Sequence, residues 1–199
     1  MTGRRYPDDP EGLFPEPPRT VEDREDRDID LQGYEPGSDI PAALVTMYED
    51  FDPSDRAQGI PPSGEPRIRD WLDELFGSGY NVVAWHDETA AGHATLVPDE
   101  QDDEFVGAGD PDDRDPPQYE LAIFVLQSYQ QAGIGTALLE TLLGFGATHG
   151  VERVWLTVEQ WNRPAINLYE AIGFETVDAR SFEREMGIRV ETPGERTPE

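Results

Sequence analysis

The segment from residue 119 to residue 158 constrains the fold of this 199-residue chain more than any other. Residues 119–126 are apolar nearly throughout, so both faces of the strand that they predict should be covered. A turn with two glycines follows, and residues 134–148 then predict an amphipathic helix that ends at Gly150. Residues 151–158 predict a second buried strand. This order of strand, helix and strand is typical of a parallel βαβ unit with a right-handed crossover.

Further elements flank this unit and make the predicted sheet mixed. Strands are expected over residues 27–34, 81–85, 91–97, 174–177 and 182–190. Helices are expected from Ser38 or Asp39 to Phe51, over 65–77, and between Asn162 and Gly173. The order along the chain is β-α-α-β-β-β-α-β-α-β-β, which indicates an α/β domain.

The length of the chain fits one folded domain with a polar tail at each end. Residues 1–26 are rich in Pro, Asp, Glu and Arg and predict a disordered acidic tail. The folded domain is expected over residues 27–190, and residues 191–199 predict a second disordered tail. Residues 98–118 predict an acidic loop inserted into the domain.

The composition excludes several classes of partner. The chain has 43 acidic and 15 basic residues, a net charge of −28, and no lysine. Because nucleic-acid binding needs clustered cations, no nucleic-acid partner is expected. The sequence has no apolar run of membrane-spanning length and no secretory signal, so we expect a cytoplasmic protein without a membrane partner. Without cysteine, and with three scattered histidines, no metal site is expected.

The acidic residues are spread over tails, loops and helix faces rather than gathered in one block. This distribution is typical of halophilic proteins that work in concentrated salt, where ions screen the self-repulsion of the chain. The alternative is an acidic mesophilic protein with charged tails. A melting curve measured against KCl concentration distinguishes the two.

The glycine turn, Tyr129 to Thr136, lies where a strand meets the start of a helix. Unpaired backbone N–H groups and the helix dipole favour an anion there, and pyrophosphate is a natural ligand. A tight turn that serves close packing is the alternative. A P-loop is excluded because it needs lysine. A dinucleotide fingerprint is weakened because Leu138 stands where its third glycine should be, although Glu152 and Glu159 lie near the distance expected of its acidic residue.

Two blocks of sequence, one at the glycine turn and one about 30 residues further on, carry a family resemblance. The first, Gln130-x-x-Gly133-x-Gly135 after a strand, is similar to the Gln/Arg-x-x-Gly-x-Gly/Ala signature of the GNAT family of N-acetyltransferases. The segment from Asn162 to Phe174 is similar to the family's Asn-x-x-Ala-x-x-Leu-Tyr-Glu-x-x-Gly-Phe block, and the spacing between the blocks also agrees. The resemblance covers about residues 80–188. With the acidic composition, it indicates a haloarchaeal-type acidic member of the family.

The resemblance implies a mixed, mostly antiparallel sheet of six to seven strands with about four helices and one splayed parallel strand pair. It implies acetyl-CoA as co-substrate, held between the splayed strands. The implied cofactor-binding residues are those of the strand that pairs with the cofactor arm, the glycine turn and the helix cap: Ile123, Phe124, Val125, Gln130, Gln131, Ala132, Gly133, Ile134, Gly135, Thr136 and Asn162. A backbone N–H near Val125 would polarise the thioester carbonyl.

The resemblance also implies transfer of the acetyl group to a primary amine by direct attack in a ternary complex. Tyr169 matches the family's general acid, which protonates the departing thiolate. Some members carry a glutamate base five residues before the asparagine, but Thr157 occupies that position here. Glu120 and Glu159 are therefore the candidate bases. The alternatives are a non-catalytic acyl-CoA-binding module on the same fold and a dinucleotide enzyme; a homodimer is compatible with the family.

Overall fold

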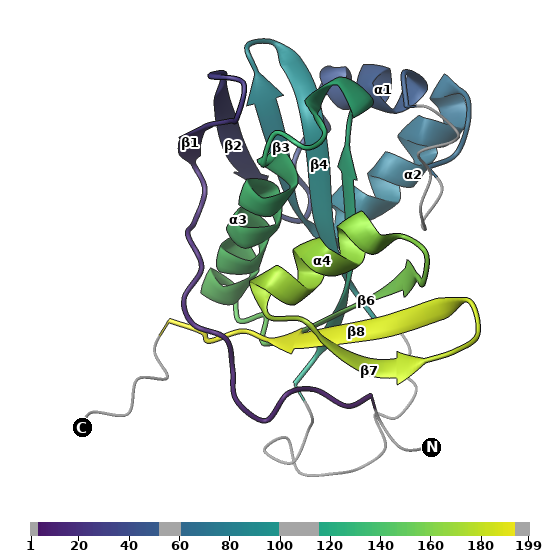
Figure 1. Ribbon diagram of the computed structural model, residues 1–199. Helices are drawn as coiled ribbons and strands as arrows, with labels where there is room; N and C mark the ends of the chain where they lie inside the picture. The colour runs from purple at the N-terminus through teal and green to yellow at the C-terminus, as the bar shows by residue number, and fades with distance from the viewer. Residues whose placement is uncertain (1–3, 52–60, 100–115, 194–199) are drawn as a thin grey trace.

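The computed structural model describes residues 4–51, 61–99 and 116–193. They form one eight-stranded sheet, with strands in the order β1-β2-β3-β4-β5-β6-β8-β7, and four α-helices (Figure 1). The strands are β1 (Arg19–Glu22), β2 (Asp28–Tyr34), β3 (Tyr80–His86), β4 (Thr89–Pro98), β5 (Gln118–Val125), β6 (Arg153–Glu159), β7 (Glu175–Ala179) and β8 (Glu183–Arg189). The α-helices are α1 (Ala42–Glu49), α2 (Glu65–Ser78), α3 (Ile134–Thr148) and α4 (Arg163–Ile172).

Strands β5 and β6 form the parallel pair that the sequence predicts, and they diverge. Only Gln118, Tyr119 and Glu120 of β5 pair with β6, at residues 153–155. Beyond Glu120, β5 continues to Val125 and pairs with β4 along its other edge. All other neighbouring strands are antiparallel. The result is a fork in the middle of the sheet whose closed end lies at Glu120.

The helices cover the two faces of the sheet. The apolar face of α3 packs against β2 to β5 in the main core, which also contains Ile166 and Ile172 of α4. Helices α1 and α2 cover the opposite face through a second cluster that includes Tyr48, Leu72, Phe76 and Phe124. Side chains of β5 alternate between these two cores, as the period of a strand requires. None of the described helices has the length and apolar character needed to cross a bilayer.

The structure corrects one predicted boundary and the predicted number of strands. Helix α1 begins at Ala42 rather than at Ser38 or Asp39, because Pro41 precedes it in an extended conformation and disfavours helical geometry at Ile40. The sheet has eight strands rather than six or seven, because β1 adds an outer strand that pairs antiparallel with β2. The predicted acidic insert lies mostly outside the described residues, while its ends, Pro98 and Gln118, belong to strands.

The prediction of a disordered tail over residues 1–26 is wrong for the residues that the structure describes, 4–26. Besides β1, Glu11 forms a β-bridge with Val190, and Phe14 packs against the main core. Figure 1 shows this purple N-terminal segment passing beside β8 and then along α3. Gly144 of α3 allows the approach, because a Cβ there would overlap the Pro15 backbone. Composition alone wrongly predicts disorder here, because a few apolar contacts and pairing at the edge of the sheet are enough to order a polar segment.

A buried polar chain on the face covered by α1 and α2 joins Tyr48 of α1 to Asn81 of β3 through His93 of β4. The Tyr48 hydroxyl lies 2.7 Å from His93 Nδ1, and His93 Nε2 lies 3.0 Å from Asn81 Oδ1. The Asn81 amide nitrogen already donates to two carbonyls, so its oxygen accepts from His93 Nε2–H and the Tyr48 hydroxyl donates to Nδ1. Burial lowers the pKa of His93 from 6.5 to about 3, so the imidazole is neutral in the folded protein.

This neutral histidine predicts a loss of stability in mild acid. The unfolded chain binds a proton at His93 below its ordinary pKa of 6.5, while the folded protein does not until about pH 3. The free energy of unfolding should therefore fall by about 2 kcal/mol from pH 7.5 to pH 5, measured by urea titration. A His93→Gln variant should lose much of this dependence. An equal pH dependence in both proteins would contradict the assignment.

Candidate active site

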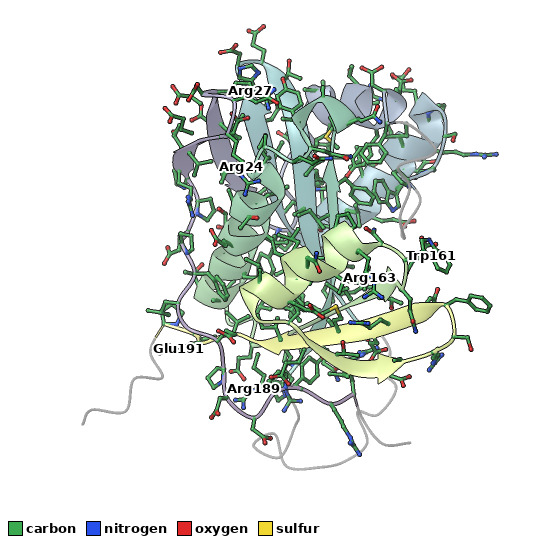
Figure 2. The ribbon with its side chains drawn as sticks, viewed as in Figure 1. Arg24, Arg27, Trp161, Arg163, Arg189 and Glu191 are labelled. Atoms are coloured by element: carbon green, nitrogen blue, oxygen red, sulfur yellow. The ribbon has the colours of Figure 1, made fainter. Side chains whose placement is uncertain are left out.

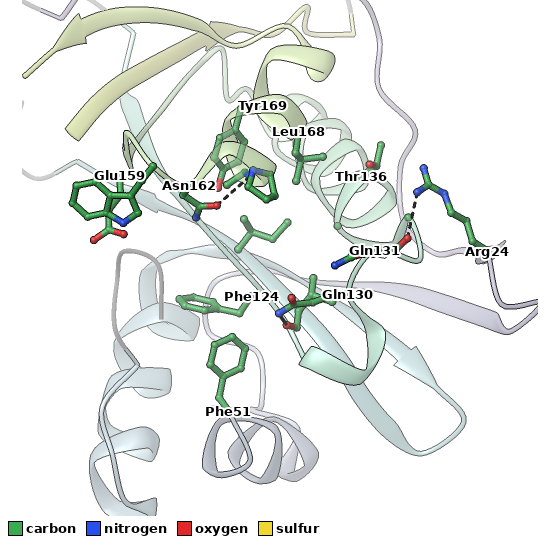
Figure 3. Close-up of a pocket in the computed structure, with 17 residues that line it drawn as sticks. Arg24, Phe51, Phe124, Gln130, Gln131, Thr136, Glu159, Asn162, Leu168 and Tyr169 are labelled. Carbon is green, nitrogen blue, oxygen red and sulfur yellow. Dashed lines mark hydrogen bonds between the residues drawn. The ribbon is translucent and has the colours of Figure 1, made fainter. Parts of the chain in front are cut away.

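A cavity of about 610 Å³ opens in the fork between β5 and β6. Figure 3 shows its walls: Phe51 and Phe124 on one side, Tyr169 and Asn162 on the other, and the glycine turn at one end. Because β5 and β6 do not pair beyond Glu120, the inner edge of β5 carries backbone polar groups that β6 does not satisfy. A narrow, extended ligand with amide groups could occupy such an edge as an additional strand.

The glycine turn forms one end of the cavity and leads into α3. Gly133 is the N-cap of α3 and has a left-handed backbone with φ +93°. Gln131 also has a positive φ, +61°, so two residues of the turn bend the chain sharply. No side chain caps the helix, and the first amides of a helix have no acceptor within it. These N–H groups, next to the positive end of the helix dipole, suit a phosphate group.

Arg24 contributes a cation to this end of the cavity. It lies in the connection between β1 and β2, its backbone N–H donates to the Ala132 carbonyl at 2.9 Å, and its guanidinium donates to the Gln131 carbonyl at 3.2 Å. Figure 2 shows Arg24 near α3, and Figure 3 shows it among the residues that line the cavity. Sequence reasoning missed this residue because nothing local connects it with a turn more than 100 residues away. Arg24 therefore brings a positive charge to the end of the cavity formed by the glycine turn.

Arg24 should strengthen binding of a phosphate-containing ligand through a solvent-exposed contact. An Arg24→Gln variant is expected to bind acetyl-CoA about three- to tenfold more weakly at 0.1 M salt, and the difference should shrink in molar salt because ions screen the charge. Calorimetric titration at the two salt concentrations measures this. Arg180→Gln, which removes an exposed arginine paired with Asp178, is the matched control. Equal affinities for the Arg24 variant and the control at low salt would exclude the role.

The β5 side of the cavity consists of Ile123, Phe124 and Val125. The Gln130 side-chain amide donates to the Val125 carbonyl at 3.1 Å, which ties the glycine turn to the end of the strand. Phe124 packs edge-on against Tyr48 and Phe51, so this wall rests on the core beneath α1 and α2. The wall is therefore rigid and largely apolar, with polar groups only along the strand backbone.

The opposite side of the cavity is built by the start and inner face of α4. Asn162 is the N-cap of this helix, and its side-chain oxygen accepts from the Ala165 N–H at 3.3 Å. Asn162 therefore caps α4 and also lines the cavity. Tyr169 lies two turns further along and also lines the cavity, with its ring packed on Phe174. Burial raises the pKa of the Tyr169 hydroxyl above its ordinary value of 10, so the group stays protonated at neutral pH.

The two candidate bases occupy different places. Glu159, at the end of β6, lines the cavity. Glu120 lies at the closed end of the fork and does not reach the cavity wall. Burial raises the pKa of the Glu120 carboxyl, the charge of Asp99 raises it further, and Arg4 opposes the change. A raised pKa suits a base near neutral pH, but a base must also reach the proton that it removes.

Most of the predicted site residues meet in this cavity. Those that line it are Ile123, Phe124, Val125, Gln130, Gln131, Gly133, Gly135, Thr136, Glu159, Asn162 and Tyr169. The side chains of Ala132 and Ile134 are buried in the core instead, so only their backbone groups face the turn. Residues that the sequence did not single out also line it: Arg24, Phe51, Trp161, Pro164, Ala165 and Leu168. Among the described residues, no group of histidine or acidic side chains could hold a metal ion.

Comparison with known proteins assigns a family to this architecture. The model of the Acetyltransferase (GNAT) family matches residues 44–174, which is more than half of the chain. The chain therefore belongs to the GNAT family of acetyltransferases. An N-alpha-acetyltransferase of Sulfurisphaera tokodaii is 43% identical over 58 residues, which make up 29% of this chain and 35% of that protein. The matches span well under two thirds of the first curated relatives.

Solved structures share the fold at low sequence identity. The GNAT domain of S. lividans PAT has a TM-score of 0.66 at 16% identity, covering 86% of this chain and 96% of that chain. A putative acetyltransferase from Salmonella typhimurium, solved with its cofactor acetyl-CoA, has a TM-score of 0.58 at 15% identity, covering 85% and 98% of the two chains. This similarity establishes the mixed α/β fold with its open sheet.

Proposed function

We propose that this protein transfers an acetyl group from acetyl-CoA to a primary amine. The observation that carries the proposal is that the glycine turn, Arg24 and Tyr169 line one cavity in the fork. The turn amides and Arg24 suit a diphosphate at one end, and the buried Tyr169 hydroxyl belongs to the same cavity. The GNAT family membership and the N-alpha-acetyltransferase relative support the same activity. A structural relative that was solved with acetyl-CoA supports the choice of co-substrate.

The proposed reaction is a direct transfer within a ternary complex. The amine nitrogen attacks the thioester carbonyl carbon; a C–N bond forms and the C–S bond breaks. The protonated Tyr169 hydroxyl supplies a proton to the departing sulfur, and a base accepts a proton from the amine. A backbone N–H near Val125, on the unpaired edge of β5, would polarise the thioester carbonyl. The chain has no cysteine to carry the acetyl group, in agreement with direct transfer.

For the base we propose Glu159, because it is the candidate carboxylate that lines the cavity. Glu120 lies at the closed end of the fork, where it could act only through intervening water. A Glu159→Gln substitution should lower kcat more than Glu120→Gln does, and the two variants in one assay decide between the positions.

A coupled assay tests the function itself. Release of free CoA is followed with a thiol reagent in concentrated KCl, with acetyl-CoA and a panel of small amines and peptides bearing free N-termini. The proposal predicts acceptor-dependent CoA release that is slower in a Tyr169→Phe variant. Binding of acetyl-CoA without turnover on any acceptor would favour the non-catalytic acyl-CoA-binding module. Binding of NADH in place of acetyl-CoA would favour the dinucleotide enzyme.

We also propose that the protein works in a salt-rich cytoplasm, as the net charge of −28 and the absence of lysine suggest. Repulsion among the carboxylates should destabilise the fold at low ionic strength, and salt should relieve it. The melting temperature is expected to rise by at least about 10 °C between 0.1 M and 3 M KCl, which corresponds to roughly 2.5–5 kcal/mol for a domain of this size. An unchanged melting temperature would remove the halophilic assignment.

A further inference from the structure

The guanidinium group of Arg4, in the N-terminal segment, is bound by four residues of the sheet and its strand ends. The Arg4 guanidinium lies over the Trp155 ring, with its central carbon 3.5 Å from the ring centroid. Its Nε donates to Glu185 at 2.9 Å, and its Nη1 donates to Asp99 and to Gln118 Oε1, both at 3.0 Å. We call the four partners, Asp99, Gln118, Trp155 and Glu185, the guanidinium site. An aromatic face with acceptors around its rim fits the planar donor fork of an arginine.

The site is largely enclosed although its occupant comes from a chain terminus. The side chains of Arg4, Asp99 and Glu185 are 19%, 11% and 27% exposed. Tyr6 fastens the same segment by donating its hydroxyl to Gln118 at 2.7 Å. Tyr6 also packs over Gly187, which faces Trp155 across β6 and β8. Arg4 places its guanidinium in the site, whereas its neighbour Arg5 is exposed to solvent.

The guanidinium site lies at the closed end of the catalytic fork. Trp155 is the direct partner of Glu120, the last pair before β5 and β6 separate. Partners on adjacent strands present their side chains to the same face of a sheet. Glu120 and Phe124 also share that face, since they are four residues apart on β5. The guanidinium site and Phe124 of the cavity wall therefore lie on one face of the sheet, opposite the face that α3 covers.

We propose that the guanidinium site binds an arginine side chain of the amine acceptor, and that Arg4 is an intramolecular competitor for it. The inference rests on the proposed function only for the identity of the ligand as an amine acceptor. The site and Arg4 as its competitor are features of this chain and do not depend on that function. Three carboxylates, those of Asp99, Glu120 and Glu185, surround Trp155 and Arg4, which favours a cation on electrostatic grounds. An acceptor peptide with an arginine would displace Arg4 and extend toward the fork.

Because Arg4 is tethered to the protein, it should weaken the binding of a free guanidinium ligand by an amount that can be measured. A short tether presents its ligand at an effective concentration of roughly millimolar or more, so a free ligand must exceed that level to replace it. Removing Arg4 should therefore lower the apparent Kd of a free guanidinium ligand by at least about tenfold. A residue that only fastens the segment would leave that affinity unchanged.

The test uses L-argininamide as the probe and the full chain in 1 M KCl. Binding is followed by the NMR signal of the Trp155 indole N–H, which a Trp155→Phe variant assigns. We expect Arg4→Gln to bind the probe at least tenfold more tightly than the unmodified protein. Arg5→Gln, which removes the same charge from an exposed neighbour, should bind like the unmodified protein. Lysinamide should bind more weakly than argininamide, because an ammonium lacks the planar fork.

Two further variants complete the design. In the Arg4→Gln background, Trp155→Leu should abolish binding of the probe, which places the probe over that ring. Arg4→Lys retains a cation to hold the segment and should give an intermediate affinity, so it serves if Arg4→Gln fails to fold. Equal affinity in the unmodified protein and whichever Arg4 variant folds, or binding that survives Trp155→Leu, would overturn the inference. Probe binding as predicted without any acetyl transfer would count against the proposed function alone.

Discussion

Replacing Gly135 by leucine is expected to abolish acetyl-CoA binding without unfolding the protein. Gly135 is the second residue of α3 and lines the cavity beside the glycine turn. A Cβ there would lie 3.6 Å from Leu168 and 3.9 Å from Val125, an ordinary contact, so the first carbon fits. The rest of a leucine side chain would enter the fork where the ligand must lie. We expect the Kd for acetyl-CoA to rise at least on the order of 100-fold, which is about 2.7 kcal/mol.

The matched control is Gly135→Ala. Alanine adds only the Cβ that the structure accommodates, and it favours a helix over glycine by up to about 1 kcal/mol. The alanine variant should therefore be as stable as the unmodified protein or more so, and it should still bind acetyl-CoA. Calorimetry and thermal melting of the two variants measure both effects. Normal binding by the leucine variant would show that the ligand does not lie against the start of α3.

Replacing Tyr169 by phenylalanine is expected to lower kcat by at least about tenfold while changing the Kd for acetyl-CoA by less than about twofold. The substitution removes only the hydroxyl and keeps the ring that packs against Phe174 at a centroid distance of 5.7 Å. The departing thiolate then has to take its proton from water. Steady-state rates of CoA release, together with calorimetric affinities, separate the two quantities.

The pH profile supplies an independent check on Tyr169. Because burial raises the pKa of this hydroxyl above 10, its deprotonation should not limit kcat at neutral or mildly alkaline pH. The unmodified enzyme should therefore show no alkaline fall in kcat from this group below about pH 9. Unchanged turnover in Tyr169→Phe would transfer the acid role to water.

The sequence predicted the parts of the fold that depend on local patterns. Helix α3 has the expected bounds, 134–148, because its apolar stripe, the preceding glycine turn and Gly150 all specify it. Asn162 and Gly173 delimit α4 as predicted, with the asparagine oxygen capping the helix and the glycine in a left-handed conformation. The fork and its glycine turn follow from these elements and the parallel strand pair.

Contacts between residues far apart along the chain could not be predicted from the sequence. Arg24 reaches Gln131 and Arg4 reaches Trp155, and neither pair has a spacing or motif that connects its members. The N-terminal segment looked like a disordered tail because its composition is polar, yet β1 gains its place by pairing with β2. The choice between Glu120 and Glu159 likewise depends on where β5 and β6 stop pairing, which places Glu120 at the closed end of the fork and Glu159 on the cavity wall. The sequence does not show where this pairing ends.

Titration of acetyl-CoA into the protein by calorimetry, in molar KCl, tests the central claim most directly. We expect binding at one site per chain, with desulfo-CoA bound comparably and NADH not bound, because the turn and Arg24 hold the diphosphate within a fork shaped for an extended amide chain. The Gly135→Leu variant should show no heat under the same conditions. Absence of binding by the unmodified, folded protein, or preference for NADH, would contradict the account.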